Sequence, residues 1–229
     1  MFLSGYGPVL LEGTWMTIQL ALLSLLLSIV IGLIGASSKL SSLKIVRNIA
    51  TAYTTLIRSV PDLVIMLLMF YSLQLGLNSI TESLNMDQID INPFVAGVIT
   101  LGFIYGAYFT ETFRGAFQAV PKGQIEAAYA YGMTSFQVFR RVLFPQMMRF
   151  ALPGIGNNWQ VLIKATALVS LIGLTDIVKI TQDAGRSTMQ VFYFSVIAAM
   201  IYLAITTISN LILMWLERRY SVGVKKGQL

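Results

Sequence analysis

Two chemically versatile side chains are missing from this sequence altogether. Its 229 residues include no cysteine and no histidine. Without cysteine the chain can form neither a disulfide framework nor a thiolate metal site. Without histidine it lacks the commonest general base and the commonest metal ligand of proteins. These absences argue against triad-type hydrolysis and zinc chemistry, so we expect neither a catalytic residue nor a metal site.

Charged side chains are also scarce, at 11% of the residues, whereas hydrophobic residues make up 56%. A soluble domain usually carries roughly 25% charged residues and about 45–50% apolar ones. The clustering of the apolar residues therefore favours a single membrane domain over residues 1–229. The net charge of +6 does not require a nucleic acid partner, because Lys and Arg gather at the cytoplasmic margins of membranes.

Five segments are long and apolar enough to cross a bilayer, since a transmembrane helix needs about 20 mostly apolar residues. We expect them at about residues 15–36, 56–77, 93–113, 150–174 and 191–216. Glycine, asparagine and lysine residues interrupt the fourth segment more than the others. The pattern predicts an all-α integral membrane protein with five transmembrane helices.

The distribution of basic residues predicts which connections face the cytoplasm. Lys and Arg are concentrated in the first connection, in the third connection and in the tail after residue 216. Residues 78–92, between the second and third segments, carry three acidic residues and no basic one. By the positive-inside rule the N-terminus is expected outside and the C-terminus in the cytoplasm, which requires an odd number of spans.

The third connection, residues 114–149, is a polar and cationic insert in a largely apolar chain. Apolar residues recur at helical spacing on both sides of Gly132. This predicts two short amphipathic helices that meet at Gly132, because glycine accepts the left-handed conformation that other residues resist. Thr134 or Ser135 is expected to cap the second helix, and Pro145 is expected to end it.

The residues of this insert allow two interpretations. It could dock against a partner protein, because the small side chains of Ala127 and Ala128 permit close approach and Glu126 offers a charge. It could instead lie on the lipid surface, with Arg140 and Arg141 facing anionic head groups.

The spacing of residues in this insert resembles a known motif. Glu126-Ala127-Ala128 is followed after three residues by Gly132, and after nine more by Val142-x-Phe144-Pro145. The pattern resembles the EAA motif of importer-type ATP-binding cassette (ABC) permeases, which ends in Ile-x-Leu-Pro. Val142 and Phe144 depart from that ending, and the spacing is intact. The stretches 107–115 and 120–124 are similar to the polar amino acid subfamily of these permeases. The stretches 153–160, 164–170 and 217–220 are similar to its basic amino acid members. Within that subfamily the chain resembles the Q-type membrane subunits of histidine, lysine, arginine and ornithine uptake systems.

The resemblance implies a type I ABC importer permease in a bacterial inner membrane. Two permease subunits, this chain and either a paralogue or a second copy, would enclose a path for an amino acid across the lipid bilayer. An ABC ATPase dimer would dock from the cytoplasm, and a solute-binding protein would deliver the amino acid from outside. Glu126, Ala127, Ala128, Gly132 and Pro145 would then form the ATPase-coupling loop.

ATP itself is expected on the partner ATPase. The chain contains no Gly-x-x-x-x-Gly-Lys-Ser/Thr phosphate-binding loop. We therefore expect no bound cofactor, no enzymatic activity and no nucleic acid partner.

Ionisable side chains within spans are candidates for function, because each costs about 2.5–3.5 kcal/mol at a helix centre. Glu111 and Asp62 could meet the cationic side chain or the ammonium group of a basic amino acid, and Lys164 could meet its carboxylate. The alternative is structural: Asp62 would pair with Arg58, and Glu111 with Lys164 or with Arg114. Both interpretations remain open on the sequence.

Asn157, Asn158 and Trp159 in the fourth segment also have two interpretations, since they could line the path or pack against neighbouring helices. Together with the resemblance, these residues favour a permease subunit of an ABC importer for polar amino acids, with arginine, lysine, ornithine and histidine favoured as substrates. One alternative is a permease for another polar amino acid, such as glutamine or glutamate. A secondary carrier is a further alternative, but it predicts inverted repeats, which the sequence does not show. A membrane anchor would leave the charges within the spans unexplained.

Overall fold

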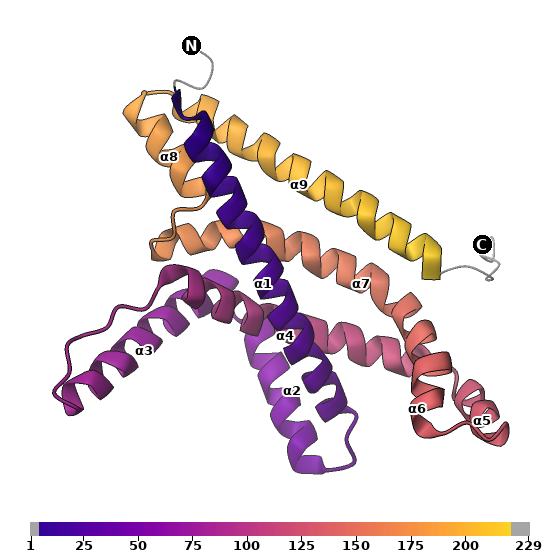
Figure 1. Cartoon of the computed structure of the whole chain (residues 1–229). Helices are drawn as coiled ribbons and strands as arrows, with labels where there is room; N and C mark the ends of the chain where they lie inside the picture. The colour runs from indigo at the N-terminus through magenta and orange to yellow at the C-terminus, as the bar shows by residue number, and fades with distance from the viewer. Residues whose placement is uncertain (1–4, 221–229) are drawn as a thin grey trace.

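The computed structural model describes residues 5–220, and every regular element within them is helical (Figure 1). In chain order the elements are α1 (Gly7–Lys39), α2 (Lys44–Ser59), α3 (Asp62–Ser83), α4 (Pro93–Ala119), α5 (Lys122–Ala130), α6 (Ser135–Val138), a π-helical turn (Phe139–Leu143), α7 (Phe144–Ala165), a 3-10 segment (Thr166–Ile172), α8 (Ile177–Ser187) and α9 (Val191–Tyr220). The basic residues Lys225 and Lys226, which contributed to the expected orientation, lie outside the described residues.

Helix length and composition indicate a multi-pass membrane protein. Among residues 5–220, α1, α3, α4 and α9 are each long and apolar enough to cross a bilayer. Residues 135–172 form a fifth candidate together with α8, from which they are separated by a bend of 57°. The described helices therefore give four or five spans.

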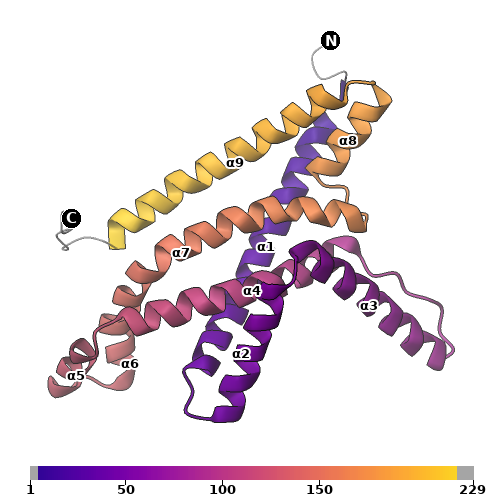
Figure 2. The same cartoon turned by 180° about the vertical axis from the view of Figure 1, so that it is seen from behind.

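The centre of the molecule is the crossing of α1 and α4, and α7 lies between α4 and α9 (Figures 1 and 2). Glycines allow the two backbones to approach closely. A Cβ atom placed on Gly32 of α1 would lie 3.0 Å from the carbonyl carbon of Phe109 in α4. A Cβ atom on Gly106 of α4 would lie 2.6 Å from the Cγ2 atom of Ile31 in α1. Membrane helices gain little by burying apolar surface against each other, because the surrounding lipid is equally apolar. Small residues at their crossings let the backbones approach closely and so increase the van der Waals contact between them.

The second expected segment is interrupted in the structure. The sequence predicts a span from about residue 56, but α2 ends at Ser59 and α3 begins at Asp62. Pro61 explains the break, because it lacks a backbone N–H and disfavours the helical conformation at the preceding residue. Val60 accordingly has an extended backbone, with φ −106° and ψ 140°.

The first, third and fifth expected segments lie within longer helices. Residues 15–36 fall inside α1, residues 93–113 fall inside α4, which continues to Ala119, and residues 191–216 fall inside α9. The start of α4 is fixed as its sequence suggests, since the side chain of Asn92 accepts a 2.8 Å hydrogen bond from the N–H of Phe94. Pro93 occupies the first turn, where its missing N–H costs nothing.

Candidate functional site

The expected pair of short helices is present as α5 and α6, which project from one end of the molecule (Figure 1). Gly132 joins them with φ +76°, the left-handed conformation that its sequence position predicts. The N–H of Gly132 donates to the carbonyl of Tyr129 at 2.9 Å, and that of Met133 donates to the carbonyl of Ala128 at 3.2 Å. These bonds satisfy the last carbonyls of α5 and fix the direction in which the chain leaves it.

Thr134 caps α6, and it is one of the two residues that the sequence predicts as the cap. Its hydroxyl accepts a hydrogen bond from the N–H of Gln137 at 3.4 Å, and the Gln137 side chain accepts one from the N–H of Thr134 at 2.9 Å. This reciprocal pair is a capping box, which satisfies two N–H groups that the first turn of a helix otherwise leaves free. The position of α6 is therefore set by local chemistry.

The expectation that Pro145 ends the second helix is wrong. The helix runs from Ser135 through the π-helical turn into α7, so that residues 135–172 form one continuous helical segment. Pro145 lies in the first turn of α7, directly after the π-helical turn at Phe139–Leu143. There the N–H of Phe144 bonds to the carbonyl of Phe139, and this wider turn accommodates a residue that cannot donate to the usual carbonyl.

The residues of the expected coupling motif divide between an exposed and a buried side of α5. Glu126 and Ala127 are exposed, whereas Ala128 is 4% exposed and packs inward. Two aromatic side chains that the sequence analysis did not single out lie beside this surface: Tyr131 is 87% exposed and Phe136 is 70% exposed. Exposed aromatic residues outside the spans are typical of a protein-binding surface.

Glu111, in the second half of α4, forms the centre of an ion-pair cluster. Its carboxylate contacts the ammonium group of Lys39, at the end of α1, and accepts a 2.9 Å hydrogen bond from Nε of Arg114. Lys39 also donates to the hydroxyl of Thr54 in α2 at 2.7 Å. The local Glu111–Arg114 pair is thus present, and among residues 5–220 no ion pair joins Glu111 to Lys164.

The sequence gives no signal for the role of Lys39, because a lysine in this basic connection predicts only the orientation of the chain in the membrane. Its partner lies 72 residues away, a distance in the chain at which no local pattern links two charges. Lys39 contacts Thr54 of α2 and Glu111 of α4, so this cluster connects α1 to both helices.

Asp62 lies at the break between α2 and α3, where it faces α4. Its carboxylate accepts a 3.0 Å hydrogen bond from the hydroxyl of Tyr105, a side chain only 1% exposed. Arg58 does not form an ion pair with any described residue; its guanidinium lies 5.4 Å from the ring centroid of Tyr108 instead. A half-buried carboxylate, a cation and two phenols therefore gather where a membrane helix is interrupted, a common setting for binding sites in transporters.

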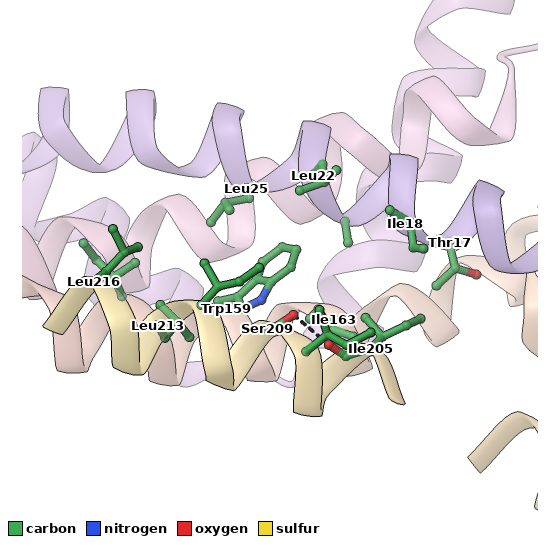
Figure 3. A pocket seen from close by; sticks show the side chains of 14 residues that line it. Thr17, Ile18, Leu22, Leu25, Trp159, Ile163, Ile205, Ser209, Leu213 and Leu216 are labelled. Carbon is green, nitrogen blue, oxygen red and sulfur yellow. Dashed lines mark hydrogen bonds between the residues drawn. The ribbon is translucent and has the colours of Figure 1, made fainter. Parts of the chain in front are cut away.

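Three consecutive residues of α7 face three different surroundings. Asn158 is 8% exposed, and its amide donates to the hydroxyl of Thr112 in α4 at 3.0 Å, so it packs two helices together. Trp159 lines an apolar hollow of about 420 Å³ between α1, α7 and α9, shown in Figure 3. Asn157 lines a separate, more polar hollow between α7 and α9. Lys164 is exposed and forms no ion pair with any described residue.

No group of three acidic side chains within residues 5–220 is placed to hold a metal ion. What the geometry provides is a projecting helix pair, charged and polar clusters between helices, and closely packed helix crossings.

Comparison with known proteins identifies the family. Residues 12–222 match the family described as the binding-protein-dependent transport system inner membrane component. The chain belongs to this family. It is 64% identical over 227 residues to the histidine/lysine/arginine/ornithine transport system permease protein HisQ of Salmonella typhimurium, covering 99% of this chain and 100% of that one. It is 35% identical over 217 residues to the arginine ABC transporter permease protein ArtQ of Escherichia coli, covering 89% of this chain and 91% of that one.

Solved structures agree with this assignment. A crystal structure of an amino acid ABC transporter with histidines matches with a TM-score of 0.78 at 33% identity, covering 93% of this chain and 95% of that one. The inward-facing methionine transporter MetNI matches with a TM-score of 0.69 at 18% identity, which shows a shared fold. The relatives are named as permease subunits, and the chain is a membrane permease rather than an enzyme.

Proposed function

We propose that this chain is a permease subunit of an ABC importer for basic amino acids in a bacterial inner membrane. The observation that carries the proposal is the likeness along the whole chain to a permease named for histidine, lysine, arginine and ornithine transport. Relatives named for arginine and for octopine support the same class of substrate. A permease for glutamine or glutamate is the second candidate, since the charged clusters between the helices suit any zwitterionic amino acid.

In the proposed topology the chain crosses the membrane five times, with the N-terminus outside. The spans are α1, α2 with α3, α4, α7 with the 3-10 segment, and α9. The basic connections support this orientation, because it leaves α5 and α6 in the cytoplasm. A partner permease, either a paralogue or a second copy, completes the path.

The ATPase dimer would bind the surface formed by Glu126, Ala127, Tyr131 and Phe136. When the ATPase closes on ATP, the two coupling loops of the permease pair would be drawn together and the attached spans would rock to expose the outward side. The energy of ATP would reach this chain through the coupling loop, because the chain has no phosphate-binding loop of its own. Coupling of this kind is a two-state equilibrium biased by a partner.

Asp62 is the residue best placed to meet the cationic end of a substrate within the spans. Its half-buried carboxylate lies at the helix break, held by one phenol, and forms no ion pair with any described residue. In this conformation Glu111 is occupied by Lys39 and Arg114, so a substrate role for Glu111 would require that cluster to open.

The test is reconstitution of the permease with its partner permease, ATPase and solute-binding protein in liposomes, followed by uptake of labelled arginine, lysine, histidine and glutamine. We expect ATP-dependent uptake of the basic amino acids and little uptake of glutamine. Preferential uptake of glutamine, or uptake without the ATPase, would contradict the proposed substrate class or the proposed mechanism.

The coupling loop is tested separately by co-purification of the ATPase with Glu126→Lys and with Gly132→Pro, whose ring cannot adopt φ +76°. Both are expected to weaken ATPase binding. The matched control is Glu82→Lys, the same charge reversal at an exposed site near the end of α3. Undiminished binding by both loop variants would remove this surface from the coupling assignment.

A further inference from the structure

The polar hollow on the flank of α7 is the feature that the proposed function does not yet use. It has a volume of about 270 Å³ and is lined by α7 and α9. Its polar side chains are Asn157 and Gln160 from α7 and Asn210 and Glu217 from α9. In each pair the two residues lie three or seven positions apart, so helical geometry places them on one face. Two apolar helices therefore turn polar faces toward a shared space.

The hydrogen bonding within this hollow fixes what it offers to a ligand. The side-chain nitrogen of Gln160 donates to the side-chain oxygen of Asn210. The oxygen of Gln160 is then left to accept hydrogen bonds, as are the two oxygens of Glu217. The amide nitrogens of Asn157 and Asn210 can donate in this hollow, whereas the oxygen of Gln160 and the carboxylate of Glu217 accept. Its one formal charge is negative, which suits a guanidinium or ammonium group.

Two arginines, Arg218 and Arg219, directly follow Glu217 in the chain. Within residues 5–220, Glu217 nevertheless forms no ion pair. The nearby Arg219 lies over the ring of Trp215, with its guanidinium carbon 5.6 Å from the ring centroid. An unpaired carboxylate in or near a membrane is costly and calls for a cation.

We propose that this hollow is a binding subsite for the cationic side chain of the transported amino acid, with Glu217 as its counter-charge and Gln160 as a hydrogen-bond acceptor. In the proposed topology it lies toward the cytoplasmic side, because Glu217 is close to the last residue of α9, where that helix returns to the cytoplasm. The substrate would occupy it after passing the helix break at Asp62. The inference rests on the proposed function, and it assigns a second, inner position to the same class of substrate.

The test uses the complete reconstituted transporter and compares Glu217→Gln with wild type. Because one charge-assisted hydrogen bond is lost, we expect arginine and lysine uptake to fall about tenfold while the complex still assembles and hydrolyses ATP. Glu217→Asp keeps the charge and should recover most of the uptake. Gln160→Met removes the second acceptor at similar volume and should cause a smaller loss, of roughly threefold.

The matched control is Asp183→Asn, which neutralises an exposed carboxylate in α8 and should leave uptake unchanged. If wild-type transporter takes up no basic amino acid, the proposed function fails. If wild type transports arginine and Glu217→Gln transports it equally well, only the inner subsite fails. If Glu217→Gln instead prevents assembly with the partner permease, the cation belongs to that partner and the subsite is likewise overturned.

Discussion

The ammonium group of Lys39, the last residue of α1, contacts the carboxylate of Glu111 in the second half of α4. Their side chains are 11% and 19% exposed, and Arg114 and Thr54 complete their contacts. The cluster therefore ties α1 and α2 to the end of α4 that leads into α5.

Lys39→Met should lower the stability of the assembled transporter by about 2 kcal/mol, because it leaves Glu111 largely buried with Arg114 as its one remaining cation. The measurement is the thermal unfolding midpoint of the detergent-solubilised complex. Lys44→Met, which removes the same charge at an exposed position of α2, is the control and should be close to neutral. Equal midpoints for the two variants would show that the ion pair contributes nothing to stability.

Gly32→Ala should impair packing between α1 and α4, since the added methyl group would meet the backbone of Phe109. Overpacking of this kind costs about 1–3 kcal/mol. At Gly76 a Cβ atom meets nothing within 4 Å, so Gly76→Ala should be neutral or slightly stabilising. Yield of monodisperse complex and its unfolding midpoint distinguish the two. A stable Gly32→Ala variant would mean that the crossing can widen at little cost.

Gly132→Ala should strain the turn between α5 and α6, because a side chain at φ +76° costs about 1–2 kcal/mol. We expect weaker ATPase binding and a smaller stimulation of ATP hydrolysis by the solute-binding protein. Gly123→Ala, in the helical part of α5 with open space around it, provides the comparison. If both variants couple normally, the geometry of this turn does not matter for docking.

Tyr105→Phe should leave the carboxylate of Asp62 without its phenolic donor while keeping the ring in place. We expect the KM for arginine uptake to change about threefold or more with little effect on assembly, since one hydrogen bond to a charged group is lost. Tyr53→Phe removes a half-buried phenol that donates to a backbone carbonyl instead, and it should affect stability alone. A KM unchanged by Tyr105→Phe would argue against a substrate site at Asp62.

Apolar runs and local chemistry could be predicted from the sequence, because they depend on neighbouring residues. The third and fifth expected segments lie inside observed helices, and Gly132 and Thr134 have the turn and cap that their types favour. Pro61 is a residue type that favours the start of a helix, as observed for α3, whereas hydropathy predicts a span that runs across it from about residue 56. Pro145 was misjudged because a π-helical turn absorbs the missing donor, and such turns have no reliable sequence signal.

Long-range pairings and side-chain directions were the part that the sequence did not determine. The contact of Lys39 with Glu111 depends on how α1 crosses α4, which glycine packing sets in three dimensions. Asn157, Asn158 and Trp159 looked like one group, yet helical rotation of about 100° per residue sends each in a different direction. Which direction is which depends on where α4 and α9 lie.

The helix that continues from α6 across Pro145 into α7 joins the proposed ATPase-binding surface to a candidate membrane span in one continuous helical segment. A partner that displaces α6 need not signal through a flexible linker, because the displacement is carried along the helix axis toward Asn157 and Lys164. The π-helical turn and Pro153, which lies inside α7, are the irregular points on this helix before the 3-10 segment. Their stiffness would then set how much of each ATPase movement reaches the far end of α7.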